Sequence, residues 1–236
     1  MTNIAQQTIA EIVTNDHRTA TIFEKYHLDF CCKGKRSLAE ACAEKGLSFD
    51  EVAAEINSLR DPGNAAETLF RHMTADHLVA YIVNRHHNYV KQIMPQLQIH
   101  IERVAQKHGD RFPYMVEVYK LFSEIKNDMT LHMQKEEMIL FPAIVRAEHA
   151  FKNKGTLNGE VNIIRGAIQV MESEHDSAGE LMLKIRELTN GYEETEGACT
   201  TFRLSLAELK AFEEDLHQHV HLENNILFPM AQGFIE

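Results

Sequence analysis

Apolar residues at spacings of three and four dominate the chain from residue 74 onward. Each such stripe is typical of one face of an amphipathic helix. Loop-forming residues separate the stripes at 107–110, at 152–159 and after Asn190. Four long helices joined by modest loops predict an antiparallel bundle. The four stripes are Leu78, Ile82, His86, Val90, Ile93, Leu97, Ile101; Val118, Phe122, Ile125, Met129, His132, Glu136, Ile139; Ile164, Ile168, Met171, His175, Ala178, Met182, Ile185; and Leu209, Phe212, Leu216, His219, Glu223, Ile226, Met230.

The first 60 residues follow a shorter pattern. Capping boxes begin at Ser37 and Ser48, each with a glutamate three residues later. Gly46 stands where a left-handed residue would end the first of these helices. The Asp-Pro-Gly-Asn segment at 61–64 is the clearest linker signal. We therefore expect a small helical domain at 1–60, a linker at 61–73 and the bundle at 74–236.

Polar residues interrupt every stripe near its middle. Burying one polar group without a partner costs roughly 1–3 kcal/mol, and an unpaired carboxylate costs more. Six such groups at similar depth on four helices need a shared partner, and a metal centre supplies one. The predicted ligands are His86, His132, Glu136, His175, His219 and Glu223.

The second half of the bundle repeats the first. The pattern HxxxExxILFP occurs at 132–142 and again at 219–229, and the lone histidines His86 and His175 precede the two copies. Because residues at i and i+4 share a helix face, each His–Glu pair can reach the same point. Two equivalent hairpins would place two equivalent metal positions around a pseudo-twofold axis.

Counting coordination positions favours a dinuclear centre. Two bridging glutamates and four histidines leave vacancies on two six-coordinate ions for a bridging oxygen and an exogenous ligand. Mixed imidazole and carboxylate ligation with vacancies suits iron, or manganese, better than a closed structural zinc site. We expect two non-haem iron ions per chain, bridged by oxygen and carboxylate.

The remaining histidines are expected to lie outside this centre. His87 sits off the stripe, and His217 lies about 200° round the helix from His219, so it should face solvent. This orientation argues against a ferritin-like ExxH site. Asp128 and Glu174 are either outer partners of the ligands or plain surface charges. The surface or loop histidines are expected to be His17, His27, His72, His77, His100, His108, His149 and His221.

Composition and charge limit the partners and the cellular location that we expect for the protein. A net charge of −11 disfavours binding to nucleic acid. No apolar run approaches the roughly 20 residues that span a bilayer, so we expect no membrane partner. The N-terminal residues lack the pattern of a signal peptide, which predicts a cytoplasmic protein. Four cysteines at this length do not indicate a disulfide framework.

These motifs resemble a known family. The order His, HxxxE, His, HxxxE resembles hemerythrin-like bundles. The segments 171–181, 221–229 and 27–35 are similar to signatures of the iron–sulfur cluster repair di-iron proteins. The resemblance covers essentially the whole chain and implies a hemerythrin-like fold, repair of clusters damaged by nitric oxide or peroxide, and a homodimer. The resemblance implies the same six metal ligands in this chain. It leaves His86 and His87 as alternatives for one of them, and only the apolar stripe selects His86.

The vicinal pair Cys31 and Cys32 is either packed in a tight turn or has a thiol role, in redox chemistry or transient iron handling. A disulfide between adjacent cysteines would be strained and easily reduced. Basic neighbours at 33, 35 and 36 are expected to lower a thiol pKa. Cys42 and Cys199 are expected to be packing residues.

The function that these residues and the resemblance favour is repair of damaged iron–sulfur proteins by supply of iron. The alternative is a hemerythrin-like protein that binds or reduces nitric oxide or O₂ at open iron sites. A di-iron oxidase is a third possibility, disfavoured because only two carboxylates are available.

Overall fold

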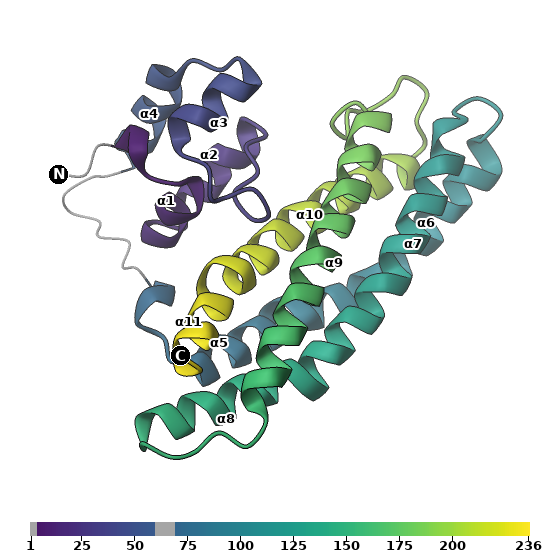
Figure 1. Ribbon diagram of the computed structural model, residues 1–236. Coiled ribbons are helices and arrows are strands. Elements are labelled where there is room, and N and C mark those ends of the chain that lie inside the picture. The colour runs from purple at the N-terminus through teal and green to yellow at the C-terminus, as the bar shows by residue number, and fades with distance from the viewer. Residues whose placement is uncertain (1–3, 60–68) are drawn as a thin grey trace.

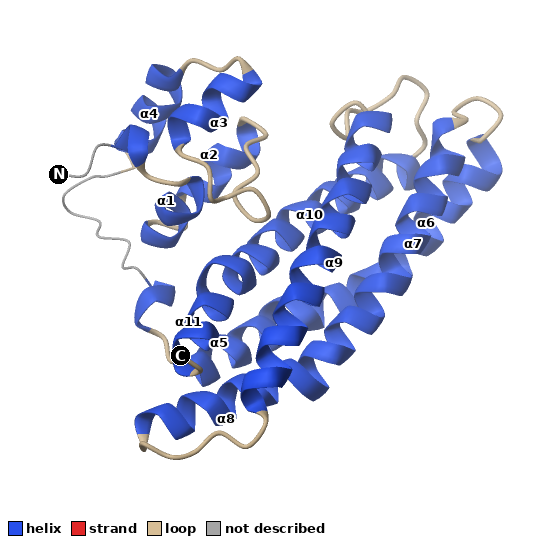
Figure 2. Cartoon of the chain, in the orientation of Figure 1, coloured by secondary structure: helices blue, strands red, loops and turns tan. Residues whose placement is uncertain are grey.

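All regular secondary structure in the residues that the computed structural model describes, 4–59 and 69–236, is helical (Figures 1 and 2). The predicted all-α fold is confirmed. The helices form a small N-terminal domain and a long four-helix bundle (Figure 1). The predicted linker segment at 61–64 lies outside the described residues, and a short 3₁₀ turn, Leu69–His72, precedes the bundle. Across the described ranges, no helix combines the length and apolarity that a bilayer span requires.

The N-terminal domain consists of four short helices that follow a 3₁₀ turn at Ile4–Gln6. They are α1 (Ile9–Asn15), α2 (Thr19–Lys25), α3 (Leu38–Lys45) and α4 (Phe49–Ser58). The predicted helix starts are present, since the hydroxyls of Ser37 and Ser48 each accept a hydrogen bond from the backbone N–H three residues later. Gly46 ends α3 with a positive φ of 65°, as expected.

A loop between α2 and α3 carries the two adjacent cysteines. A β carbon at Gly34 would overlap the carbonyl oxygen of Phe30, so only glycine allows the loop to fold back here. The backbone N–H of Ala10 donates to the Gly34 carbonyl at 2.9 Å and ties the loop to α1. The loop therefore has a defined shape that presents Cys31 and Cys32 beside the bundle.

Each of the four long helical segments of the bundle is called a rod here. Three of the four rods contain a π-helical turn, in which backbone hydrogen bonds span five residues instead of four. The α9 rod contains none. In chain order the elements are α5 (Ala75–Ile82), the π-turn Val83–His87, α6 (Asn88–His108), α7 (Tyr114–Lys135), the π-turn Glu136–Leu140, α8 (Phe141–Lys152), α9 (Glu160–Leu188), α10 (Thr200–Leu222), the π-turn Glu223–Leu227 and α11 (Phe228–Phe234).

Proline explains two of the π-turns. Pro142 and Pro229 each stand two residues beyond the end of such a turn. Proline has no N–H, and its ring crowds the carbonyl four residues earlier, which the wider turn relieves. Accordingly the N–H of Phe141 bonds to the carbonyl of Glu136, five residues back, and the second motif repeats this bond.

Two apolar layers fill the bundle, with a polar layer between them. One contains Val90, Met129, Leu181 and Leu216 among others, and continues toward the loops at 109–113 and 189–199. The other contains Ile82 with residues of α8 and α11 at the opposite end. The polar interruptions of the four stripes therefore lie at one level, enclosed from both ends.

The N-terminal domain contacts the bundle at the π-turn of the last rod. The side-chain amide of Asn225 donates to the carbonyl oxygens of Phe30 at 3.3 Å and Cys31 at 3.1 Å. The Cys31 side chain joins the apolar layer that contains Leu216. The cysteine loop is thus attached to the segment that also carries Glu223.

Two histidines expected at the surface lie beneath this domain, one half-buried and the other buried. His217 does not face solvent, because its Nδ1 lies 2.6 Å from a carboxylate oxygen of Glu24. His221 is 3% exposed and its ring lies 5.6 Å from that of Phe30. Both expectations were wrong because they treated the bundle without the domain that covers it.

Candidate metal centre

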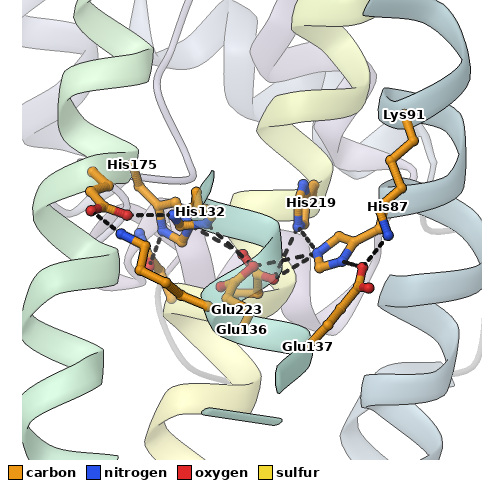
Figure 3. Close-up of polar contacts among 11 residues, drawn as sticks. His87, Lys91, His132, Glu136, Glu137, His175, His219 and Glu223 are labelled. Carbon is orange, nitrogen blue, oxygen red and sulfur yellow. Dashed lines mark hydrogen bonds and ion pairs between the residues drawn. The ribbon is translucent and has the colours of Figure 1, made fainter. Parts of the chain in front are cut away.

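Six polar side chains from the four rods converge in the middle layer (Figure 3). Each is at most 1% exposed. One comes from the end of the first π-turn, two begin the other π-turns, and three come from α7, α9 and α10. They are His87, His132, Glu136, His175, His219 and Glu223.

The six residues form two sets of four that share both glutamates. One set adds His87 and His219 to the glutamates, and the other adds His132 and His175. Within each set the possible ligand atoms all lie within 4.8 Å of one another. The carboxylates therefore lie between two histidine pairs, as the internal repeat predicted.

The distances within each set fit a metal ion. The Nε2 atoms of His87 and His219 lie 3.0 Å apart, and those of His132 and His175 lie 2.9 Å apart. Two ligands bonded at about 2.1 Å to one ion, at a right angle, would be about 3 Å apart.

The carboxylates also fit a bound cation. Both side-chain oxygens of Glu136 and the Oε2 atom of Glu223 are buried without a hydrogen-bond partner. Leaving a buried carboxylate uncompensated is strongly unfavourable. A cation in each set would compensate these charges.

Outer hydrogen bonds orient three of the histidines so that Nε2 faces the centre. These bonds join Nδ1 of His87 to Glu137 (2.7 Å), of His132 to Glu174 (2.9 Å) and of His175 to Asn224 (2.9 Å). Such bonds fix the tautomer in which Nε2 is a free ligand atom. Of the two outer partners considered from the sequence, Glu174 takes this part and Asp128 is exposed.

Without a cation the centre holds protons. Burial opposes charge on the imidazoles, but the neighbouring carboxylates of Glu136 and Glu223 raise the pKa of His87 to about 10. Burial likewise opposes charge on His132, but the negative charge of Glu136 raises the pKa of His132 to about 9. The same negative field that retains these protons would retain metal cations, which must displace them.

The structure brings His87, and not the predicted His86, into the converging sets. His86 is buried but lies outside both sets; its Nδ1 is 3.1 Å from Asp215, and its ring stacks on His219 at 5.6 Å. The π-turn is the reason, because it makes the step from Ile82 to the next site-facing residue five instead of four.

The adjacent cysteines lie in a compact polar loop. One carboxylate oxygen of Asp29 accepts the backbone N–H groups of Cys31, Cys32 and Lys33 at 3.1, 3.0 and 3.3 Å. The Sγ atom of Cys31 lies 3.3 Å from that oxygen and 3.7 Å from the Sγ of Cys32. Cys32 is half-buried, and its sulfur lies near Gly179 of α9.

The expected lowering of a thiol pKa by basic neighbours is wrong for Cys31. Its hydrogen bond to Cys32, its burial and the negative charge of Asp29 raise the pKa of Cys31 well above its usual value. Cys42 is buried in the N-terminal domain and Cys199 packs against the bundle core, so both behave as the packing residues that were predicted.

Two family models match separate parts of the chain. A family model described as "Hemerythrin HHE cation binding domain" matches residues 78–231, and one described as "Domain of Unknown function (DUF542)" matches residues 5–60. The first of these covers the helices that supply all six side chains of the polar layer.

Sequence similarity to other proteins covers nearly the whole chain. Iron-sulfur cluster repair protein YtfE of Pectobacterium atrosepticum is 34% identical over 226 residues, 95% of this chain and 96% of the relative. The protein of the same name in Yersinia pseudotuberculosis is 34% identical over 91% of both chains. Iron-sulfur cluster repair protein ScdA of Staphylococcus haemolyticus is 33% identical over 93% of this chain and 95% of its own. The resemblance seen in the sequence is confirmed, and the chain belongs to the family of iron–sulfur cluster repair proteins with a hemerythrin-type cation-binding domain.

Proposed function

We propose that this chain is a di-iron protein that repairs iron–sulfur clusters damaged by nitrosative or oxidative stress by supplying iron. The observation that carries the proposal is the pair of buried four-residue sets that share Glu136 and Glu223. The names of the relatives, iron-sulfur cluster repair proteins, support the same function. The residues that would hold the two irons are His87, His132, Glu136, His175, His219 and Glu223.

The ligand set suits iron that can be given away. Each ion would be held by two imidazoles and a share of two carboxylates, which is fewer protein ligands than a six-coordinate iron can take. When bound, the centre would supply exchangeable iron and electrons. The protein side chains orient the ligands through Glu137, Glu174 and Asn224 and exclude bulk water from the layer.

Anaerobic loading with Fe(II) tests this function. We expect about two irons per chain and recovery of a cluster enzyme inactivated by nitric oxide. Glu136→Ala and Glu223→Ala should each lose iron and repair, because each removes a ligand common to both sets. Glu124→Ala, an exposed glutamate on α7, is the matched control and should change neither. A folded chain with one tightly held zinc and no capacity for iron would contradict the proposal.

A second candidate function is binding of nitric oxide or O₂. It is favoured by a cavity of about 260 Å³ whose lining includes His132, Glu174 and the apolar side chains of Ile125 and Met129. A diatomic ligand would fit this space. Stoichiometric uptake of nitric oxide by the iron-loaded protein, without repair of a damaged enzyme, would favour this function over iron supply.

The location, the partners and the oligomeric state of the protein are also proposals. We infer that it acts in the cytoplasm on damaged iron–sulfur proteins, as a homodimer. The apolar side chains of Leu131, Met138 and Ile139 are 60%, 76% and 52% exposed near the second π-turn, which supports association at this surface. Light scattering on the wild type and on Met138→Asp tests the dimer: a wild-type dimer that the substitution weakens is expected.

A further inference from the structure

A second group of metal-ligating side chains lies outside the polar layer of the bundle. Asp29, Cys31 and Cys32, in the loop between α2 and α3, place one ligand atom each within 4.8 Å of one another. Iron bound in the bundle would not involve them. Their geometry, surroundings and charge indicate a function of their own.

The separation of the two sulfur atoms suits a shared metal ion. The Sγ atoms of Cys31 and Cys32 are 3.7 Å apart. Two thiolates bound at about 2.3 Å to one tetrahedral ion would be about 3.8 Å apart. The Asp29 carboxylate, one oxygen of which lies 3.3 Å from the Cys31 sulfur, adds a third donor group of the hard type that divalent ions also accept.

The loop is already ordered for such binding. Three backbone N–H groups hold the Asp29 carboxylate, and Asn225 holds the carbonyls of Phe30 and Cys31. The Cys31 side chain is fixed by its burial in the bundle core. Because the donors need not be ordered at the moment of binding, less entropy is lost.

Charge favours a cation here over a free thiolate. Asp29 lies beside both thiols, so ionisation of either would place two negative charges together. A divalent ion removes the conflict, since it would replace both thiol protons and face three anionic groups.

We propose that Asp29, Cys31 and Cys32 form a second cation site, for one thiophilic divalent ion of the Fe(II) or Zn(II) class. Two S–H bonds lose their protons to solvent, two metal–sulfur bonds form, and no electron is transferred. The half-buried position of Cys32 leaves one side of the ion open to a further ligand. Only the identity of the natural cation rests on the proposed function: in an iron-supplying protein it is Fe(II) on its way to a client.

Cobalt(II) is the probe for this site. Full-length, iron-loaded, reduced protein is titrated anaerobically while thiolate-to-cobalt absorption and proton release are recorded. We expect one equivalent per chain, with release of about two protons per ion at neutral pH. Cys31→Ser and Cys32→Ser should each weaken binding at least about tenfold. Cys42→Ser and Cys199→Ser are matched controls in the same chain and should bind as the wild type does.

The iron content of the same samples separates this proposal from the previous one. Wild-type iron content in Cys31→Ser and Cys32→Ser shows that the bundle is folded, so loss of the cobalt signal then belongs to the loop. Absence of thiolate absorption in the wild type, or absorption that survives both substitutions, overturns the cation site. If the protein shows the thiolate signal but does not retain iron, the result supports the cation site. Only the proposed di-iron function is then contradicted.

Discussion

The two adjacent histidines of the first π-turn have different surroundings although both are buried. The Nε2 of His87 lies within 3.4 Å of a Glu136 oxygen and 3.0 Å from His219. His86 instead directs Nδ1 to Asp215 and supports His219 by stacking. Single substitutions of the two histidines can therefore distinguish a metal ligand from a residue that only supports a ligand.

We expect His87→Ala to lower the iron content from about two to about one per chain, because the set containing His132 and His175 stays intact. His86→Ala should keep about two irons at saturating iron, since it removes a neighbour of the ligands and no ligand. Metal analysis after anaerobic loading measures both. Loss of iron in His86→Ala with none in His87→Ala would return the ligand role to His86.

The hydrogen bond to Cys32, burial and the negative charge of Asp29 together raise the pKa of Cys31 and lower the reactivity of its thiol. Because the pKa of Cys31 is raised, its thiolate forms only at a pH above the ordinary range, and alkylation at pH 7.5 should be slow. In Asp29→Asn the remaining amide oxygen can still accept the loop N–H groups while the negative charge is gone, so the pKa falls. We expect alkylation several-fold faster in this variant, measured by mass spectrometry against pH, with Cys199 as the internal reference. An unchanged rate would mean that burial and the hydrogen bond to Cys32 protect Cys31 without a contribution from Asp29.

At the scale of helices, apolar periodicity predicts the rods but not where they widen. The four stripes, the two capping starts and five of the six converging residues follow from spacing alone. The number of residues between successive core-facing positions across the π-turns does not follow from this spacing. Ile139 continues the predicted stripe yet is 52% exposed, because the core resumes at Leu140 and Phe141. The proline that follows each HxxxExxILF segment was the local signal of a wider turn, whereas the turn that places His87 has no such signal.

Replacing that proline tests the link between the wider turn and the metal centre. Pro142→Ala restores a backbone donor, which lets the turn tighten and rotates Glu136 away from its shared position. We expect faster loss of iron to a chelator. Pro95→Ala is the control, since Pro95 lies inside α6 away from any π-turn. It should raise the free energy of unfolding, on the order of 1–3 kcal/mol, and leave iron retention unchanged. Equal retention in both variants would show that the π-turn does not set the position of Glu136.

At the scale of the whole molecule, the N-terminal domain covers one side of the bundle and leaves its pseudo-symmetric counterpart open. Asn225, in the third π-turn, contacts the cysteine loop, whereas Met138, at the equivalent place 87 residues earlier, is 76% exposed. Contacts such as His217 with Glu24 join residues 193 apart in the chain. No local pattern predicts them, which is why the sequence indicated two modules but not how they meet.

The two modules should be separable in function. Removal of residues 1–60 is expected to leave a folded bundle with about two irons, because every residue of the polar layer and both apolar layers, apart from Cys31, lie beyond residue 74. A bundle of this length buries enough apolar surface to fold alone. Repair of a nitric-oxide-damaged enzyme should fall, since the loop with Cys31 and Cys32 is gone. Circular dichroism, iron analysis and the repair assay measure the three outcomes.

The full-length Cys31→Ser/Cys32→Ser double variant is the control that assigns the loss. It keeps the domain over His217, His221 and Asn225, so it removes the thiols without uncovering the bundle. If repair falls equally in the truncated chain and the double variant, the thiols account for what the domain contributes. If only truncation impairs repair, the domain acts by covering the bundle or by holding a client. Undiminished repair by the bare bundle would remove the N-terminal domain from the chemistry, and loss of iron on truncation would mean that the covered face around Asn225 is needed to hold Glu223 in place.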